Sequence, residues 1–203
     1  MPPRTKQRTT AANGGTRRDE LLGIAARLFA TNGYSQTTVR DIADEAGILS
    51  GSLYHHFDSK ETMLREILKE FMGDLARGFS EIVAKGAPAR ETLDELVHNA
   101  FETIHERPHE VALYQNEAAV FDKLGGFDFV EKTSRENERL WIGVLRAGCE
   151  AGDFRGDLEP GIAYRFIRDT VWSSVRWYNP RGKLKHDVLA GQYLSMLYGG
   201  ILA

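Results

Sequence analysis

The sequence predicts an all-α protein of about nine helices, in which three helices form an N-terminal headpiece and the others form a larger body. Apolar residues recur at helical spacing through most of the 203 residues, and no strand-like alternation persists. The six prolines and the glycine pairs fall between these periodic stretches, where helices end. A content of 42% hydrophobic and 27% charged residues is ordinary for a globular chain, so the helices can enclose a core.

The first two helices are predicted from their end signals. Residues 1–16 have almost nothing to bury and are expected to form a disordered basic tail. A helix is then expected over residues 16–32, because its apolar residues share one face and Asn32-Gly33 favours a helix end. The run Thr38-Val39-Arg40-Asp41 is typical of a capping box, and it predicts a second helix that ends near Ala46.

A tight turn and a third helix are expected next. Gly47 tolerates the conformation in which a chain reverses. After it, Ile48 and Leu49 are expected to point inward, and Ser50 is expected to cap a helix that reaches about Phe57.

The remainder of the chain is expected to form one long helix and five further ones. The long helix starts at Asp58-Ser59-Lys60-Glu61 and reaches about Ala84, so it connects the headpiece to the body. The five amphipathic helices that follow are expected over residues 88–106, 108–123, 127–152, 159–179 and 184–201.

Composition excludes several classes of protein. No apolar run approaches the roughly 18 residues needed to cross a bilayer, and the N-terminus lacks the apolar centre of a secretory leader. One cysteine, Cys149, cannot form an internal disulfide, and the six histidines show no metal-ligand spacing. The sequence therefore predicts a cytoplasmic protein with no metal, no cofactor and no membrane partner.

The charge of the chain is unevenly distributed. The net charge is −3, but residues 1–60 hold eight Lys or Arg against six Asp or Glu, whereas the remainder holds 18 against 23. A basic end on an acidic body can dock on phosphate groups while the body is repelled by them. Basic tails often only increase solubility, so charge alone does not establish nucleic-acid binding.

The second and third helices have the spacing of a helix-turn-helix. The third helix would place small residues at its start, where it can approach base edges, and polar side chains along its outer face. The alternative is a small helical bundle whose tyrosine and histidine are ordinary surface residues. The residues expected to contact double-stranded DNA are Arg40, Ser50, Gly51, Ser52, Tyr54, His55 and Lys60.

The segment TTVRDIADEAGILSGSLYHHFDSKETML, residues 37–64, resembles the DNA-binding signature of the TetR family nearly position for position. This resemblance implies a helix-turn-helix domain over residues 17–64 and a ligand-binding and dimerisation domain over residues 65–203. It also implies that the chain is a homodimeric transcriptional repressor that binds a palindromic operator and is released by a small effector.

The segment YRFIRDTVWSSVRWY, residues 164–178, combines arginines with large aromatic side chains. Arg168 and Trp172 are four residues apart and share one helical face, which Arg176 would extend. An arginine between aromatic walls suits an anionic ligand with an apolar body. Alternatively, the tryptophan is a core or dimer contact and Arg165 pairs with Asp169.

The segments AGILSGSLYHHFDSKE and YRFIRDTVWSSVRWY, with YQNEA at residues 114–118, resemble the actinobacterial TetR-type repressors of cholesterol ring C and D catabolism. The resemblance implies an effector that is the CoA thioester of an indane-propanoate steroid fragment. A sensor of fatty acyl-CoA or of a hydrophobic drug is one alternative, and a helical acyl-CoA enzyme is another. The candidate ligand contacts are Arg168, Trp172, Arg176, Trp141 and Tyr114.

The last helix is expected to form the dimer interface, as its family resemblance implies, with the CoA end of the ligand nearby. Its large apolar residues recur every four positions, and its glycines would permit a close approach. The same stripe is equally consistent with the core of a single chain. The residues concerned are Leu189, Tyr193, Leu197, Gly200 and Ile201.

Overall fold

The computed structural model describes residues 16–201, without the side-chain surroundings of residues 118, 122 and 200, so the expected tail lies outside the described residues. Within that range it confirms the all-α prediction, with ten α-helices and one short 3₁₀ helix. The elements are α1 (Arg17–Asn32), α2 (Val39–Glu45), α3 (Ser50–Leu53), α4 (Lys60–Ala84), α5 (Ala89–Glu106), α6 (Pro108–Asn116), α7 (Ala118–Leu124), α8 (Asp128–Ala151), α9 (Pro160–Ser173), η1 (Ser174–Arg176) and α10 (His186–Ile201).

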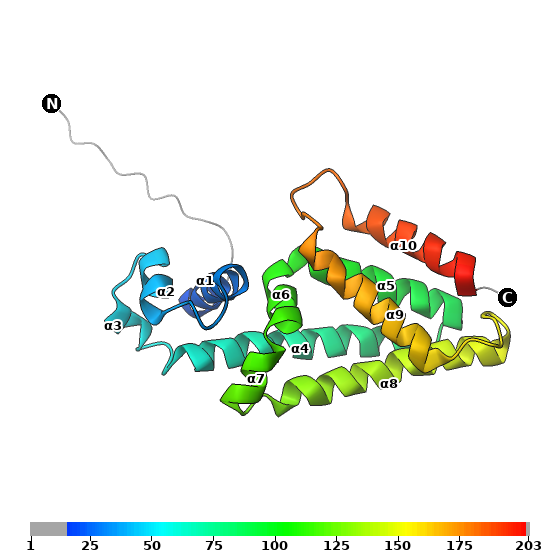
Figure 1. Cartoon of the computed structure of the whole chain (residues 1–203), viewed down its shortest axis with the longest axis horizontal. Coiled ribbons are helices and arrows are strands. Elements are labelled where there is room, and N and C mark those ends of the chain that lie inside the picture. Colours follow the sequence, from blue (N-terminus) through cyan, green and yellow to red (C-terminus); the bar gives the residue numbers. More distant parts are fainter. Residues whose placement is uncertain (1–15, 202–203) are drawn as a thin grey trace.

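The helices form a small headpiece at one end and a larger body at the other (Figure 1). The headpiece consists of α1, α2 and α3, and α4 runs from it along the body for about 37 Å, at 1.5 Å per residue. In the body, α8 packs along α4 and α5, while α10 packs along α5. One continuous set of buried apolar side chains extends through both parts, from Leu21 to Ile201.

The first two helices begin where the sequence predicts, and their caps show why. The Thr16 hydroxyl accepts a hydrogen bond from the Asp19 backbone N–H, and the Asp19 carboxylate accepts one from the Thr16 N–H. Thr38 and Asp41 form the same reciprocal pair at the start of α2. The backbone and hydroxyl donors of Thr38 hold the pKa of Asp41 below its usual range, so this cap is present at neutral pH.

The third helix differs from the prediction. It ends at Leu53, a tighter turn continues to Phe57, and Ser50 is its first residue rather than its cap. The N-cap is Leu49, whose extended backbone and exposed side chain contradict the expectation that it points inward. Neighbouring side chains on extended backbone point to opposite sides, so Ile48 can pack against the core only if Leu49 faces solvent.

Two body helices are interrupted. The helix expected over 108–123 breaks at Glu117, whose non-helical backbone ends α6 and starts α7. The described residues therefore form ten α-helices where the sequence predicts about nine. The helix expected over 159–179 ends at Ser173 and tightens into η1. None of the helices between residues 16 and 201 has both the length and the apolar character needed to cross a membrane.

Candidate nucleic-acid interface and ligand pocket

The headpiece holds α2 and α3 together through a small apolar core. Ile42, Ala43, Leu53 and Phe57 are buried, and Ile48 packs against them. Gly47 has a φ of +66°, which L side chains rarely adopt, and it turns the chain between the two helices. This core fixes the angle between α2 and α3, as a helix-turn-helix requires.

Six of the seven predicted DNA contacts lie on α2, on α3 and in the turn that follows α3, at one end of the molecule (Figure 1). The Arg40 side chain is 83% exposed and its Nε lies 3.6 Å from the Asp44 carboxylate, a pair too exposed to immobilise it. Gly51, Tyr54 and His55 are exposed, while Ser50 and Ser52 are half-buried. The structure therefore brings these six residues into one region.

Lys60, which the sequence predicts to contact DNA, is engaged by other groups of the chain. Its Nζ donates hydrogen bonds to the carbonyls of Tyr34 at 2.8 Å and Thr37 at 2.9 Å, and lies 4.3 Å from the centroid of the Tyr34 ring. Burial lowers its pKa. Two of its three N–H donors therefore join α4 to the loop after α1.

Leu49 is a surface residue that the sequence reasoning missed. Its side chain is 80% exposed, directly before α3 and among the predicted DNA contacts. No side chain caps α3, although serine, threonine, asparagine or aspartate is usual at this position. The signal available in the sequence was the pair Ile48-Leu49, since only one of two neighbouring side chains in an extended turn can face the core.

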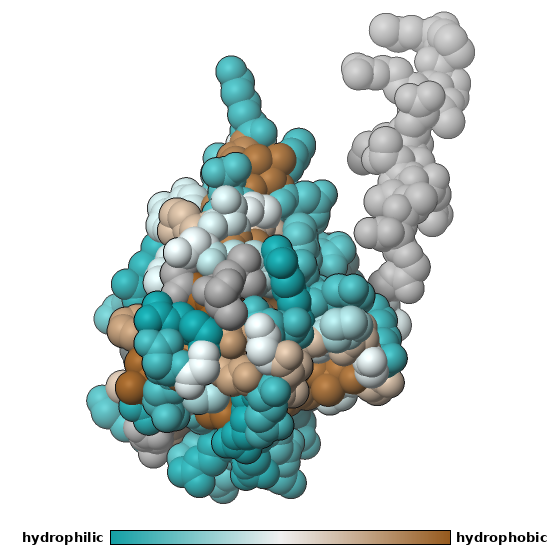
Figure 2. Space-filling model, turned by 90° about the vertical axis from the view of Figure 1, so that its right-hand side faces the viewer, coloured by the Kyte–Doolittle hydropathy of each residue, from teal (hydrophilic) through white to brown (hydrophobic). Residues whose placement is uncertain are grey.

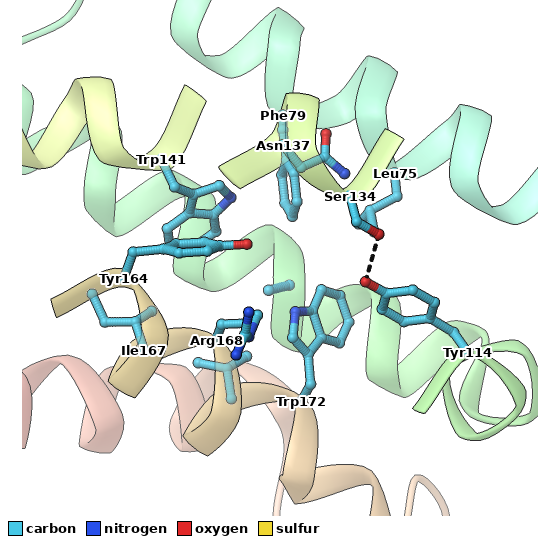
Figure 3. A pocket seen from close by; sticks show the side chains of 12 residues that line it. Leu75, Phe79, Tyr114, Ser134, Asn137, Trp141, Tyr164, Ile167, Arg168 and Trp172 are labelled. Atoms are coloured by element: carbon cyan, nitrogen blue, oxygen red, sulfur yellow. Dashed lines mark hydrogen bonds between the residues drawn. The ribbon is translucent and has the colours of Figure 1, made fainter. Parts of the chain in front are cut away.

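The body contains a narrow pocket between α4, α5, α6, α8 and α9. Its cavity volume is about 20 Å³, roughly the room of one water molecule, within about 430 Å³ of space between its walls and at its open mouth. Its walls are mainly aromatic and aliphatic. Four of the five predicted ligand residues line it together: Tyr114, Trp141, Arg168 and Trp172 (Figure 3). Arg176 does not join them, because the chain tightens into η1 after Ser173 and this side chain is exposed on the surface.

Arg168 is the one cation among the residues that line this pocket. Its Nε donates to the Asp169 carboxylate at 2.8 Å, and Asp169 raises the pKa of Arg168 through that bond, so Asp169 pairs with Arg168 rather than with Arg165. The guanidinium lies 5.8 Å from the centroid of the Tyr164 ring. Because the side chain is 40% exposed, it stands where the pocket meets solvent.

The opposite wall carries polar groups that the sequence reasoning did not identify. The Ser134 hydroxyl donates a hydrogen bond to the Val130 carbonyl at 2.8 Å. Its proton is thereby used, so the Tyr114 hydroxyl, whose oxygen lies 2.8 Å from the Ser134 Oγ, is the donor in the bond between these two side chains. Asn137 lies one turn further along α8 and is 7% exposed. Trp141 follows, with its ring 5.4 Å from that of Phe79 (Figure 3). In the sequence, Ser134 and Asn137 are two polar residues within an apolar stripe of helical period, a pattern that could have indicated a polar place on this wall.

The stripe named for dimerisation packs largely within the chain. Leu189, Tyr193 and Leu197 are half-buried and Ile201 is buried, because this face of α10 covers α5. The Tyr193 ring lies 5.7 Å from that of Phe101, and its hydroxyl lies 2.9 Å from that of Thr170. The surroundings of Gly200 lie outside the described residues.

A different set of apolar residues is exposed on α9 and α10. These side chains are between 53% and 76% exposed, and those on each helix are spaced to share a face. Viewed from the α10 end, hydrophobic residues are interspersed in a mostly hydrophilic surface (Figure 2). We refer to Ile162, Phe166, Val188 and Met196 as the exposed apolar face.

Comparisons with known proteins agree with this architecture. Residues 21–67 match the family of bacterial regulatory proteins called the tetR family, and residues 86–201 match the tetracyclin repressor-like C-terminal domain. The chain is 48% identical over 201 residues to the HTH-type transcriptional repressor KstR2 of Rhodococcus jostii, covering 99% of this chain and 98% of that protein.

Solved structures give the same result. The ketosteroid transcriptional regulator KstR2 of Mycobacterium tuberculosis superposes with a TM-score of 0.90 at 45% identity, over 95% of this chain and 98% of that one. AibR, in complex with isovaleryl coenzyme A and operator DNA, has a TM-score of 0.78 at 22% identity, over 90% of this chain and 98% of that one, and shares the fold. The chain therefore belongs to the TetR family and, like the repressors it matches along nearly its whole length, is a DNA-binding transcriptional repressor and not an enzyme.

Proposed function

We propose that this repressor acts in the cytoplasm as a homodimer on a palindromic operator, and is released by the CoA thioester of a bicyclic indane-propanoate steroid fragment. The observation that carries the proposal is the single cation, Arg168, at the mouth of a pocket whose other walls are mainly aromatic and aliphatic. A guanidinium can bind a phosphate or a thioester oxygen, while the apolar interior suits fused rings. The relative named a ketosteroid regulator supports this class of ligand.

Helix α6 offers a route from the pocket to the headpiece. It supplies Tyr114 to the pocket wall and packs along α1. At its end, the Glu117 carboxylate accepts a hydrogen bond from the backbone N–H of Tyr34, 3.2 Å away in the headpiece. A ligand that shifts α6 therefore changes the position of the headpiece. The coupling is reciprocal: the factor by which the ligand lowers the affinity for DNA equals the factor by which DNA lowers the affinity for the ligand.

A DNA-release titration tests the proposal. The chain is bound to a fluorescent symmetric operator fragment from its own upstream region and is challenged with the indane-propanoate, its CoA thioester and palmitoyl-CoA. We expect release by the steroid thioester alone. Release by palmitoyl-CoA at equal or lower concentration would favour a fatty acyl-CoA sensor, and DNA binding unaffected by all three would reject a CoA-thioester effector.

The exposed apolar face predicts where two copies meet. Phe166 is 69% exposed, so a Phe166→Glu change is expected to place a charge in the dimer interface and to convert the protein to a monomer at micromolar concentration. Light scattering coupled to gel filtration measures this. Ala147→Glu, which adds the same charge on an exposed part of α8, is the control and is expected to remain dimeric. A dimeric Phe166→Glu protein would place the interface elsewhere.

Leu49 is predicted to contact a thymine methyl group in the major groove, because it is an exposed apolar side chain at the start of the helix that reads DNA. Replacing thymine by uracil removes only that methyl. At one half-site position we expect the affinity of the native chain for DNA to fall about fourfold, which corresponds to the free energy of burying one methylene-sized group. Leu49→Ser is expected to show no such loss at that position in fluorescence anisotropy. An equal loss in both proteins would contradict the contact.

A further inference from the structure

Asn137 is a buried polar residue in the ligand pocket with its amide unpaired. The residue is 7% exposed, in the middle of α8, and its side chain lines the pocket near Ser134 and Trp141 (Figure 3). No hydrogen bond to its amide is formed within the described residues, whereas the neighbouring Tyr114 hydroxyl is satisfied by Ser134. The chain thus keeps two N–H donors and a carbonyl acceptor available inside an apolar space.

An amide without a protein partner on a pocket wall is left to bind water or a ligand. Polar groups inside native proteins are nearly always paired, and where the protein supplies no partner, water or a ligand does so. A leucine of similar size would pack against Phe79 and Leu75, which also line this pocket, without leaving a polar group unpaired. The Asn137 side chain instead presents its amide on the wall of the pocket.

We infer that Asn137 hydrogen-bonds a neutral oxygen substituent, a ketone or a hydroxyl, on the ring body of the effector, and so sets the specificity of the pocket. The inference rests on the proposed function and names the ring oxygen as a second group that the pocket recognises, in addition to the thioester. The amide suits either oxygen, because its NH₂ donates to a ketone and its carbonyl also accepts from a hydroxyl.

The distribution of charge in the pocket indicates a neutral oxygen at this place. Arg168 projects from α9, across the pocket from Asn137 on α8 (Figure 3), and it is the only lining residue that carries a full positive charge. An anionic oxygen next to Asn137 would lie between Leu75, Phe79 and Trp141, with no cation among them. The anionic part of the ligand is therefore held at the Arg168 end and the oxygenated ring at the Asn137 end.

The test compares three indane-propanoyl CoA thioesters that differ only at the ring: a ketone, the corresponding alcohol and the fully deoxygenated compound. Calorimetry measures their binding to the native homodimer, to Asn137→Leu and to Asn137→Ala. We expect the native protein to prefer either oxygenated ligand over the deoxygenated one by about tenfold. Both variants are expected to lose that preference, with the affinity for the deoxygenated ligand kept within threefold.

Stability provides a second readout. Removing an unpaired buried amide is expected to leave the thermal midpoint of Asn137→Leu unchanged or raised, which a residue important only for folding would not do. Asn99→Ala, the matched change on α5 outside this pocket, is expected to keep the native preference. The inference is overturned if Asn137→Leu and Asn137→Ala retain the tenfold preference, or if the native protein binds all three ligands equally. Failure of all three to bind would reject the proposed function itself.

Discussion

Replacing Arg168 by methionine is expected to weaken binding of the steroid CoA thioester by roughly 10- to 100-fold, the loss typical of a hydrogen bond to a charged group. Methionine keeps most of the length of the side chain and its contacts with the aromatic wall, but it removes the guanidinium that stands at the mouth of the pocket. Operator affinity without ligand is expected to remain within twofold, because Arg168 lies in the body, far along the chain from α3.

The measurement is the DNA-release titration, repeated with Arg168→Met. Arg176→Met is the matched control, since it removes the same charge from the same segment but at a side chain outside the pocket. We expect Arg176→Met to respond to the thioester as the native protein does. If Arg176→Met loses the response while Arg168→Met retains it, the anionic part of the ligand binds outside the pocket described here.

The second large effect is expected at Gly148, in the last turn of α8. A Cβ added there would lie 2.2 Å from two ring carbons of Phe154, a residue with no exposed surface. The ring cannot retreat easily, because the backbone N–H groups of Asp153 and Phe154 both donate to the Gly148 carbonyl. Gly148→Ala is expected to cost about 3 kcal/mol, near the upper end of typical overpacking, and to lower the melting temperature by about 6–12 °C.

Gly143 provides the control on the same helix. A Cβ at Gly143 meets nothing within 4 Å, so Gly143→Ala is expected to stabilise α8 by up to about 1 kcal/mol through helix propensity. Calorimetric or circular-dichroism melting of the two variants should therefore shift in opposite directions. If the Gly148→Ala protein has the same melting temperature as the native one, the loop that holds Phe154 can move aside at little cost in free energy.

The fold could be predicted from the sequence wherever its determinants are local. Thr16 and Thr38 each precede an aspartate by three residues, and both pairs form the reciprocal caps that start α1 and α2. Gly47 forms the turn that the headpiece requires, with a positive φ. These features depend on hydrogen bonds and backbone conformations within a few residues, so the family assignment followed from one segment of the chain.

The site was predicted only in part. Arg168 and Trp172 share a helical face as their spacing indicates, and the pocket also contains Trp141 and Tyr114. Helical spacing failed for Arg176, because it assumes a helix that continues, and η1 changes the direction of the side chain. Asn137 interrupts an apolar stripe of helical period together with Ser134, but that pattern does not show which residues face it across the pocket.

The sequence by itself determined the helices and the helix-turn-helix of this protein, because caps, turns and apolar periodicity act over short distances along the chain. Its role as a repressor followed from the resemblance of residues 37–64 to the TetR family. The tertiary structure decided which side chains are held by other segments, which are exposed and which are left unpaired. Lys60 is held by the carbonyls of Tyr34 and Thr37, Leu49 is left outside, and Asn137 is left unpaired within the pocket. These outcomes depend on contacts between segments distant in the sequence, where burial and hydrogen bonding are settled only once the helices pack.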